Sequence, residues 1–155
     1  MTRVIAAILL VLFALTTTAE AGLGSHATMY VGGTVTSIKQ ETEGKSSTDD
    51  EKAFLFEYQG GKLLIPYERI NQLEYGQKAG RRIGLAIAVN PIALLSKKRR
   101  HFLTISYLDD GEKQQAVVLE LGKDIVRTTL ASVQARSGRK IEYQDEEARK
   151  NGLGN

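Results

Sequence analysis

Two short strand-like runs joined by a pair of glycines constrain the fold of this chain more than any other feature. Residues 53–59 (AFLFEYQ) and 62–67 (KLLIPY) are rich in aromatic and aliphatic side chains, and Gly60 and Gly61 separate them. A two-residue glycine link between such runs is a strong β-hairpin signal, because glycine readily adopts the positive φ of a tight turn. Pro66 has no amide hydrogen to donate, so it marks an edge or the end of the second strand. The chain is therefore predicted to be mainly β.

Further strand-like runs lie on both sides of this hairpin. Residues 28–38 (TMYVGGTVTSI) predict a first strand, in which two consecutive glycines suggest a bulge or a sharp bend. Residues 68–76 (ERINQLEYG) predict a turn into a fourth short strand. A second hairpin is predicted within residues 102–121, where FLTISYL and QQAVVLEL flank the turn residues Asp109, Asp110 and Gly111.

One amphipathic helix is predicted near the C-terminus. Apolar positions within residues 123–137 recur at helical spacing, and Gly138 follows them as a C-cap. Residues 140–143 are a candidate for a last edge strand. Two polar segments have no apolar period, so residues 39–52 are predicted to be a mobile loop and residues 144–155 a disordered tail. The helical apolar positions are Ile125, Val126, Thr129, Leu130 and Val133.

These elements predict a single mainly β domain at residues 22–143. Several short antiparallel strands followed by one amphipathic helix form a small bent sheet or partly open barrel of about six to seven strands, which the helix caps. The chain has no cysteine, so no disulfide braces the domain, and its stability must come from its apolar core.

The order of these elements resembles the pleckstrin-homology-like (PH-like) fold, including its bacterial and GRAM-type relatives. The resemblance covers about residues 28–138 and is carried by the strand count and the lone C-terminal helix. It is also carried by the stretch IPYERINQLEYG at residues 65–76, which looks like the third strand of that fold and the turn into the fourth. A lipocalin-like or other small barrel is the competing assignment.

The resemblance implies a binding scaffold more than an enzyme, since PH-like domains usually bind phospholipid headgroups, peptides or protein partners. Lipid-binding members commonly place basic residues on the first two strands and on the loop between them. In this chain the corresponding residues 39–52 carry five acidic and three basic side chains. An anionic headgroup would meet as much repulsion as attraction there, so no binding residue is carried over from the family.

The N-terminus has the three parts of a cleavable secretory signal peptide at residues 1–21. Arg3 supplies a positive charge, an apolar run of about a dozen residues follows, and Ala19 and Ala21 stand at the positions that signal peptidase reads. The run is shorter than the roughly 20 apolar residues of a membrane-spanning helix. We therefore expect an exported protein, periplasmic or secreted, that begins at about Gly22; a retained anchor is the alternative.

A second apolar run, from Ile83 to Leu95 (IGLAIAVNPIALL), lies between two groups of basic residues. Its thirteen residues are too few to cross a bilayer as a helix, which needs about 20, and Asn90-Pro91 divides them. Two interpretations remain open. The run is either a connection packed on the domain core, or a segment that dips into a membrane interface while the cations meet anionic lipid. The candidate binding residues are Lys78, Arg81, Arg82, Lys97, Lys98, Arg99 and Arg100.

The residue types needed for catalysis or metal binding are sparse. The histidines are His26 and His101, and there is no cysteine. His101 is interpreted as a turn or packing residue, or alternatively as a group that protonates and strengthens the basic patch. The acidic residues Asp49, Asp50 and Glu51, and the pair in the second hairpin, lie in turns where carboxylates commonly accept local hydrogen bonds. We therefore expect no enzyme, no metal and no cofactor.

Export also argues against nucleic acid as the partner of the basic residues, and no aromatic platform accompanies them. The sequence therefore predicts a non-enzymatic binding module that contacts an anionic envelope surface or an acidic protein partner. One alternative is a structural or assembly protein that oligomerises through Ile83 to Leu95. Another is an enzyme or ligand-carrying barrel, which would need a deep pocket with converging polar groups.

Overall fold

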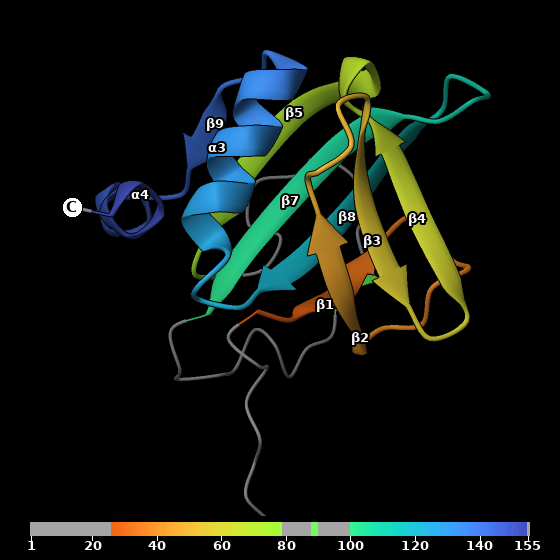
Figure 1. The fold of residues 1–155 in the computed structure, drawn as a ribbon, viewed down its shortest axis with the longest axis horizontal. Coiled ribbons are helices and arrows are strands. Elements are labelled where there is room, and N and C mark those ends of the chain that lie inside the picture. Colours follow the sequence, from red (N-terminus) through yellow and green to blue (C-terminus); the bar gives the residue numbers. More distant parts are fainter. Residues whose placement is uncertain (1–25, 79–87, 90–99, 155) are drawn as a thin grey trace, which may run out of the picture.

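The computed structural model describes residues 26–78, 88–89 and 100–154, and the predicted signal peptide lies outside them. The protein is mainly β (Figure 1): one open, mixed sheet and two short C-terminal helices. Along the sheet the strand order is β4-β3-β2-β1-β8-β7-β5-β9, and the two-residue β6 pairs with β1.

The first four strands form an antiparallel meander. The predicted glycine hairpin is confirmed as β3 and β4, which pair from Ala53 opposite Pro66 to Tyr58 opposite Gly61. Gly60 has φ +112°, the conformation that the turn requires of it. The four strands are β1 (Thr28–Gly33), β2 (Thr42–Ser47), β3 (Ala53–Tyr58) and β4 (Gly61–Pro66).

The predicted bend in the first strand is also confirmed, and it ends the strand earlier than predicted. The register between β1 and β8 shifts between Tyr30 and Gly32, and Gly33 has φ +153°. A side chain at Gly33 would place its Cβ 2.2 Å from the carbonyl oxygen of Ala116. The close approach of the two backbones therefore requires glycine, and β1 stops at residue 33 rather than 38.

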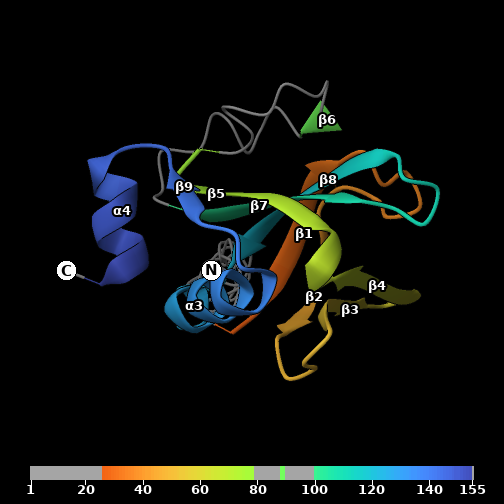
Figure 2. The same ribbon diagram turned by 90° about the horizontal axis from the view of Figure 1, so that it is seen from above.

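The second half of the sheet contains the predicted second hairpin. This half of the sheet consists of β5 (Ile70–Gly76), β7 (His101–Leu108) and β8 (Gln114–Leu121), and the 3₁₀ turn η1 (Tyr67–Arg69) precedes β5. The predicted hairpin is the pair β7 and β8. β1 pairs with both β2 and β8, so it joins the two halves of the sheet (Figure 2). Residues 65–76, which were predicted to be the third strand and the turn into the fourth, are the last residues of β4 followed by η1 and β5. The strand numbers are one higher than predicted because β2 was not predicted.

One core lies between the bent halves of the sheet and helix α3 (Val126–Ser137). Phe54, Phe56 and Ile65 from the first half are fully buried together with Leu73 and Ile105 from the second. The helix adds four of the five side chains that its apolar spacing predicted, the fifth, Ile125, being its N-cap residue, and Gly138 caps its C-terminus with φ +67°. The buried helix residues are Val126, Thr129, Leu130 and Val133.

The prediction of a mobile loop at residues 39–52 was wrong, because that segment contains β2. The side chains of β2 are polar or absent on both faces of the strand, so the sequence has no alternation of apolar and polar residues there. Ser46 Oγ lies 2.7 Å from the Oγ1 of the buried Thr28, and Lys45 stands opposite Glu57 on β3. The strand is held by its backbone ladder and by these polar pairs rather than by apolar side chains.

The predictions of a disordered tail, a single helix and a purely antiparallel sheet were also wrong. β9 (Ile141–Tyr143) pairs in parallel with β5, and α4 (Glu146–Leu153) follows it. Asp145 caps α4 by accepting a hydrogen bond from the Ala148 amide at 2.7 Å. Ala148 is fully buried, and Gly152 packs so closely that an added Cβ would lie 2.8 Å from Tyr143. Small residues allow this docking, which a search for large apolar side chains misses.

Candidate surface-binding site at one end of the sheet

The chain from Lys78 to Arg100, which contains all seven candidate binding residues, is called the basic segment here. Its two ends meet at one end of the sheet. β5 and β7 run antiparallel, with Gly76 opposite Phe102. Residues directly opposite each other in such a pair have Cα atoms about 5 Å apart. Lys78 follows the end of β5 and Arg100 precedes the start of β7. The first and last of the predicted binding residues therefore leave the sheet side by side.

Lys78 is exposed, and its backbone is held in place. The side-chain amide of Gln144 donates from Nε2 to the Lys78 carbonyl oxygen at 2.7 Å, and its Oε1 accepts from the Lys78 amide at 3.3 Å. The same Nε2 donates to Glu74 Oε1 at 2.9 Å. Gln144 thus fixes where the chain leaves β5, a role that the predicted disorder of this region concealed.

Arg100 is held in an ion pair and is less available than predicted. Its Nη1 donates to Glu120 Oε2 at 2.9 Å, and the side chains of Arg100 and Glu120 are 31% and 8% exposed. Burial raises the pKa of Glu120, and the Arg100 guanidinium opposes this rise. Much of the Arg100 charge therefore neutralises a carboxylate within the sheet. We assign it to anchoring the segment rather than to contacting a partner.

The other five candidate residues, Arg81, Arg82, Lys97, Lys98 and Arg99, lie outside the described residues. Of the apolar run from Ile83 to Leu95, only Ala88 and Val89 are described. They form β6 (Ala88–Val89), with Val89 opposite Gly32 and Ala88 opposite Gly33. β6 lies on the side of the sheet opposite α3 (Figure 2). The middle of the run is therefore paired to the domain's own sheet.

His101 is a packing residue, as one of its two interpretations predicted. Its Nδ1 lies 2.6 Å from Tyr75 Oη, and the two rings stack with centroids 6.2 Å apart. Tyr143 meets Tyr75 edge to face at 6.0 Å. Burial lowers the pKa of His101, which favours the neutral imidazole. This environment opposes the alternative in which His101 protonates to strengthen the basic patch.

The acidic turn residues accept local hydrogen bonds, as predicted. Asp50 Oδ1 accepts from the amides of Lys52 and Ala53, at 2.7 and 3.0 Å. Asp109 Oδ2 accepts from Gln115 Nε2 at 2.8 Å, and its Oδ1 accepts from two backbone amides of the hairpin turn. These bonds, with that of Gln115 foremost, lower the pKa of Asp109. The carboxylates stabilise turns and do not converge on a pocket.

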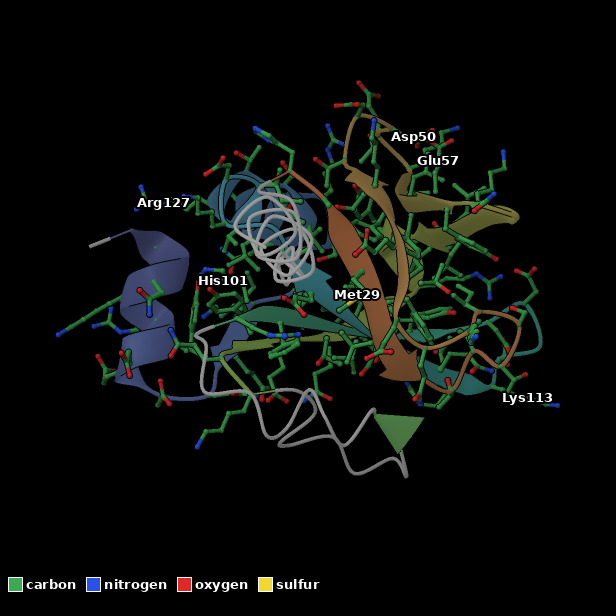
Figure 3. The ribbon with its side chains drawn as sticks, turned by 90° about the horizontal axis from the view of Figure 1, so that it is seen from below. Met29, Asp50, Glu57, His101, Lys113 and Arg127 are labelled. Carbon is green, nitrogen blue, oxygen red and sulfur yellow. The ribbon has the colours of Figure 1, made fainter. Side chains whose placement is uncertain are left out.

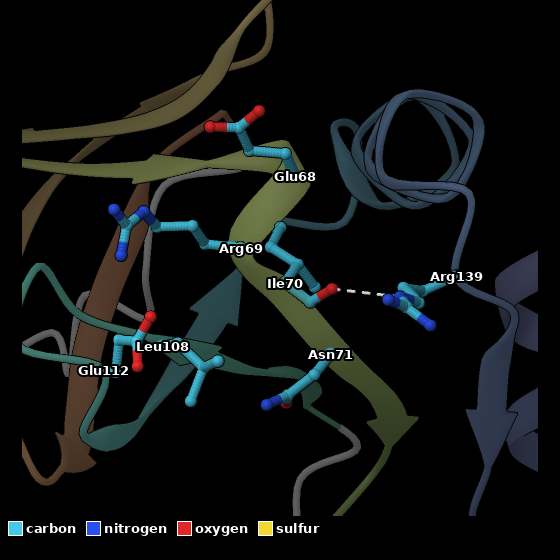
Figure 4. Close-up of a pocket in the computed structure, with 7 residues that line it drawn as sticks. All are labelled: Glu68, Arg69, Ile70, Asn71, Leu108, Glu112 and Arg139. Carbon is cyan, nitrogen blue, oxygen red and sulfur yellow. Dashed lines mark hydrogen bonds between the residues drawn. The ribbon is translucent and has the colours of Figure 1, made fainter.

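An open cleft of about 400 Å³ lies at the other end of the sheet (Figure 4). Two arginines border it, and both are bonded to backbone carbonyls. Arg139 Nε donates to Ile70 at 3.0 Å, and Arg69 Nη1 donates to Asp109 at 2.6 Å. No sequence feature pointed to this cleft, and its lining mixes both charges. It is lined by Glu68, Arg69, Ile70, Asn71, Leu108, Glu112 and Arg139.

Within the described parts of the chain, no three histidine, aspartate or glutamate residues are grouped so that they could hold a metal ion. Neither of the helices described there is long and apolar enough to cross a membrane. No protein-family model and no curated protein matches this sequence.

Proposed function

We propose that this chain is an exported, non-enzymatic PH-like module that binds an anionic lipid surface through the basic residues between β5 and β7. The observation that carries this proposal is the pairing of Gly76 with Phe102. It brings together, at one end of the sheet, two basic groups that a long apolar run separates in the sequence.

Chain length alone limits how far these cations lie from that end. Successive Cα atoms are 3.8 Å apart, so Arg82 lies within about 15 Å of Lys78, and Lys97 within about 11 Å of Arg100. Both basic groups are thus tied, through short stretches of chain, to the end of the sheet that carries Lys78 and Arg100. Clusters of four to eight basic residues favour anionic lipid by about 1 kcal/mol for each Lys or Arg near the surface.

The contact is proposed to be electrostatic rather than an insertion of the apolar run. β6 pairs the middle of that run with β1, which limits how far it can extend into a bilayer. Arg100 is engaged by Glu120, so the proposal does not count it among the surface contacts. Binding of this kind weakens as salt screens the charges, because the Debye length falls from about 10 Å at 0.1 M to about 3 Å at 1 M.

The PH-like part of the proposal is supported by the strand order. A four-strand meander, β1 to β4, is joined through β1 and β8 to the antiparallel strands β5, β7 and β8. Helix α3 follows and packs on the core between the two halves. These seven strands and α3 support the resemblance, whereas the short β6, the parallel β9 and α4 are additional to it. The export part rests on the sequence of residues 1–21.

The test is sedimentation of the chain from Gly22 onward with phosphatidylglycerol vesicles and with phosphatidylcholine vesicles at low salt. We expect binding to the anionic vesicles only, and a loss of at least a hundredfold in K97E/K98E/R99E, because three contacts of about 1 kcal/mol are reversed. The matched control is K52E/K113E/K140E, which makes the same charge change on three exposed residues remote from Lys78 and Arg100.

Three results would reject the proposal: equal binding to both kinds of vesicle, no binding to either, or equal losses in the two triple variants. Failure to bind vesicles combined with a stable oligomer in light scattering would favour the alternative of a subunit interface between Ile83 and Leu95. Binding to an acidic protein without binding to anionic vesicles would favour a protein partner.

A further inference from the structure

We propose that the lipid-binding surface extends beyond the basic segment between β5 and β7. It also includes the connection between β8 and α3, where Lys123 and Arg127 make additional cationic contacts. This inference rests on the proposed function and specifies how the domain is oriented on the surface. We call this surface the lower rim. It comprises the start of β1, the end of β5, the start of β7 and residues 122–127.

Strand register places these chain segments together. Leu121, at the end of β8, is opposite Thr28 on β1 and opposite His101 on β7. The end of β5 lies beside the start of β7, as described above. Four strands thus begin or end at the lower rim, which lies at the lower left of the domain in Figure 1.

The connection after β8 stays on this rim. The Gly122 amide donates to the Ala27 carbonyl oxygen at 2.8 Å, and the Ile125 amide donates to Gly122 at 3.1 Å as the chain turns into α3. Lys123 and Arg127 are both exposed. More than 20 residues separate them from the basic residues that end at Arg100, so no sequence pattern groups them with that segment.

Arg127 lies against the end of α4 on this rim. A Cβ added to Gly154 would lie 2.0 Å from Arg127 Cζ, so the guanidinium rests on the C-terminal cap of α4. Figure 3, which views the molecule from below, shows Arg127 beside the end of α4, with His101 nearer the centre of the same face.

Several carboxylates in and near the rim have partners. Glu120 is paired with Arg100, and Asp145 caps α4. Asp124 Oδ2 lies 3.7 Å from His26 Nε2, and the two form an ion pair only when His26 is protonated. On α4, Glu146 pairs with Arg149 at 2.9 Å. Lys78, Lys123 and Arg127 are exposed, and these pairings offset part of the negative charge near them.

The N-terminal segment gives an independent reason for this orientation. The sequence predicts a signal peptide at residues 1–21, and membrane contact is one of the two interpretations of the basic-flanked apolar run. The first joins the domain at the start of β1 and the second joins it at Lys78 and Arg100. Both attachments are on the lower rim. The precursor would therefore present to the membrane the same rim that the released domain uses for binding.

The first experiment compares K123E/R127E with K113E/K140E, two double charge reversals in the chain from Gly22 onward, on phosphatidylglycerol vesicles at low salt. We expect K123E/R127E to bind at least tenfold more weakly than the control pair. Unfolding curves establish that each variant is folded, and K123E alone, expected to lose at least threefold, is used if Arg127→Glu disrupts the docking of α4.

The second experiment uses the absence of cysteine to place one environment-sensitive fluorophore at a time. A label at Thr128→Cys, exposed beside the rim, should shift to the blue when the vesicles bind, and a label at Glu112→Cys at the other end should not. If K97E/K98E/R99E abolishes binding while K123E/R127E matches its control, this inference is wrong and the proposed function stands. If neither set of reversals weakens binding, both are wrong.

Discussion

Tyr75 Oη and His101 Nδ1 lie 2.6 Å apart at the end of the sheet from which the basic segment leaves. The pair joins the second-last residue of β5 to the first residue of β7. Tyr143 from β9 packs edge to face against the Tyr75 ring. Burial raises the pKa of the Tyr75 hydroxyl and lowers that of the His101 imidazole, so both groups are held neutral. A neutral hydrogen-bonded pair thus supports the base of a strongly cationic segment.

This environment predicts that the stability of the protein falls when the pH drops below about 6.5, the usual pKa of histidine. A lowered folded-state pKa means that the unfolded chain takes up the proton first. The contribution of His101 is complete above the unfolded-state pKa and is lost as the pH falls through the folded-state pKa. Urea unfolding at pH 7.5 and pH 5.0 should show a smaller loss of stability in His101→Gln than in the wild type. Equal losses would contradict the assignment.

The ion pair between Arg100 and Glu120 predicts a pH-dependent cost of removing the arginine. Arg100→Met leaves a buried carboxylate without its partner and should lower the free energy of unfolding by about 2 kcal/mol at pH 7. Because burial raises the pKa of Glu120, its protonated form is favoured in the folded state. The stability linked to that form is present at low pH and is lost as the pH rises through the folded-state pKa. The cost of the variant should therefore shrink toward pH 4.

A compensating substitution provides the control for this ion pair. Replacing both partners, in R100M/E120Q, removes the unpaired charge and should recover most of the stability lost in Arg100→Met at pH 7. Denaturant unfolding of the wild type, both single variants and the double variant measures the coupling energy. A double variant as unstable as the sum of the two single variants would show that Arg100 and Glu120 do not act as a pair.

The sequence was most informative where apolar side chains alternate or recur at helical spacing. The β3–β4 hairpin, the β7–β8 hairpin and α3 were predicted because burial on one face leaves a periodic pattern. β2 and α4 leave no such pattern. β2 is held by backbone pairing and by polar contacts such as Thr28 with Ser46, and α4 docks through Ala148 and Gly152, residues too small to register as an apolar stripe.

The candidate site was predictable only in its charge. The run of cations is visible in the sequence, but Arg100 looks the same as its neighbours until Glu120 is found beside it on β8. The grouping of Lys123 with Lys78 depends on the pairing of β8 with β7, a long-range register that no local pattern encodes. Gln144, which fixes the exit of the chain from β5, was placed in a tail expected to be disordered.

Salt should separate an electrostatic contact from an inserted one. If the cations provide the binding energy, the affinity for phosphatidylglycerol vesicles should fall more than tenfold between 0.05 M and 0.5 M NaCl, because the charges are screened. Burial of apolar residues in the membrane interface is not weakened by NaCl in this way. Vesicle sedimentation across this range decides between them, and undiminished binding at 0.5 M would favour insertion of the apolar run.

Arg136 should order the turn between β2 and β3. Its Nη1 donates to the carbonyl oxygens of Thr48 and Asp50, and its guanidinium lies 5.7 Å from the centre of the Tyr67 ring. Arg136→Ala should speed amide hydrogen exchange at residues 48–52 about tenfold and cost about 1 kcal/mol. Arg136→Lys should restore little, since a single ammonium cannot reproduce the planar fork of donors. Unchanged exchange in both variants would show that the turn is ordered by Asp50 alone.

The docking of α4 should depend on the absence of a side chain at Gly152. A Cβ at this position would lie 2.8 Å from Tyr143 Cε1 and 3.2 Å from atoms of Leu130 and Tyr75. Gly152→Val should therefore displace α4, cost about 2 kcal/mol and speed hydrogen exchange throughout residues 146–153. Leu153→Ala is the matched control, because that side chain is 52% exposed and its removal should cost less than about 0.5 kcal/mol. Equal effects of the two substitutions would contradict the close packing of α4 against β5 and β9.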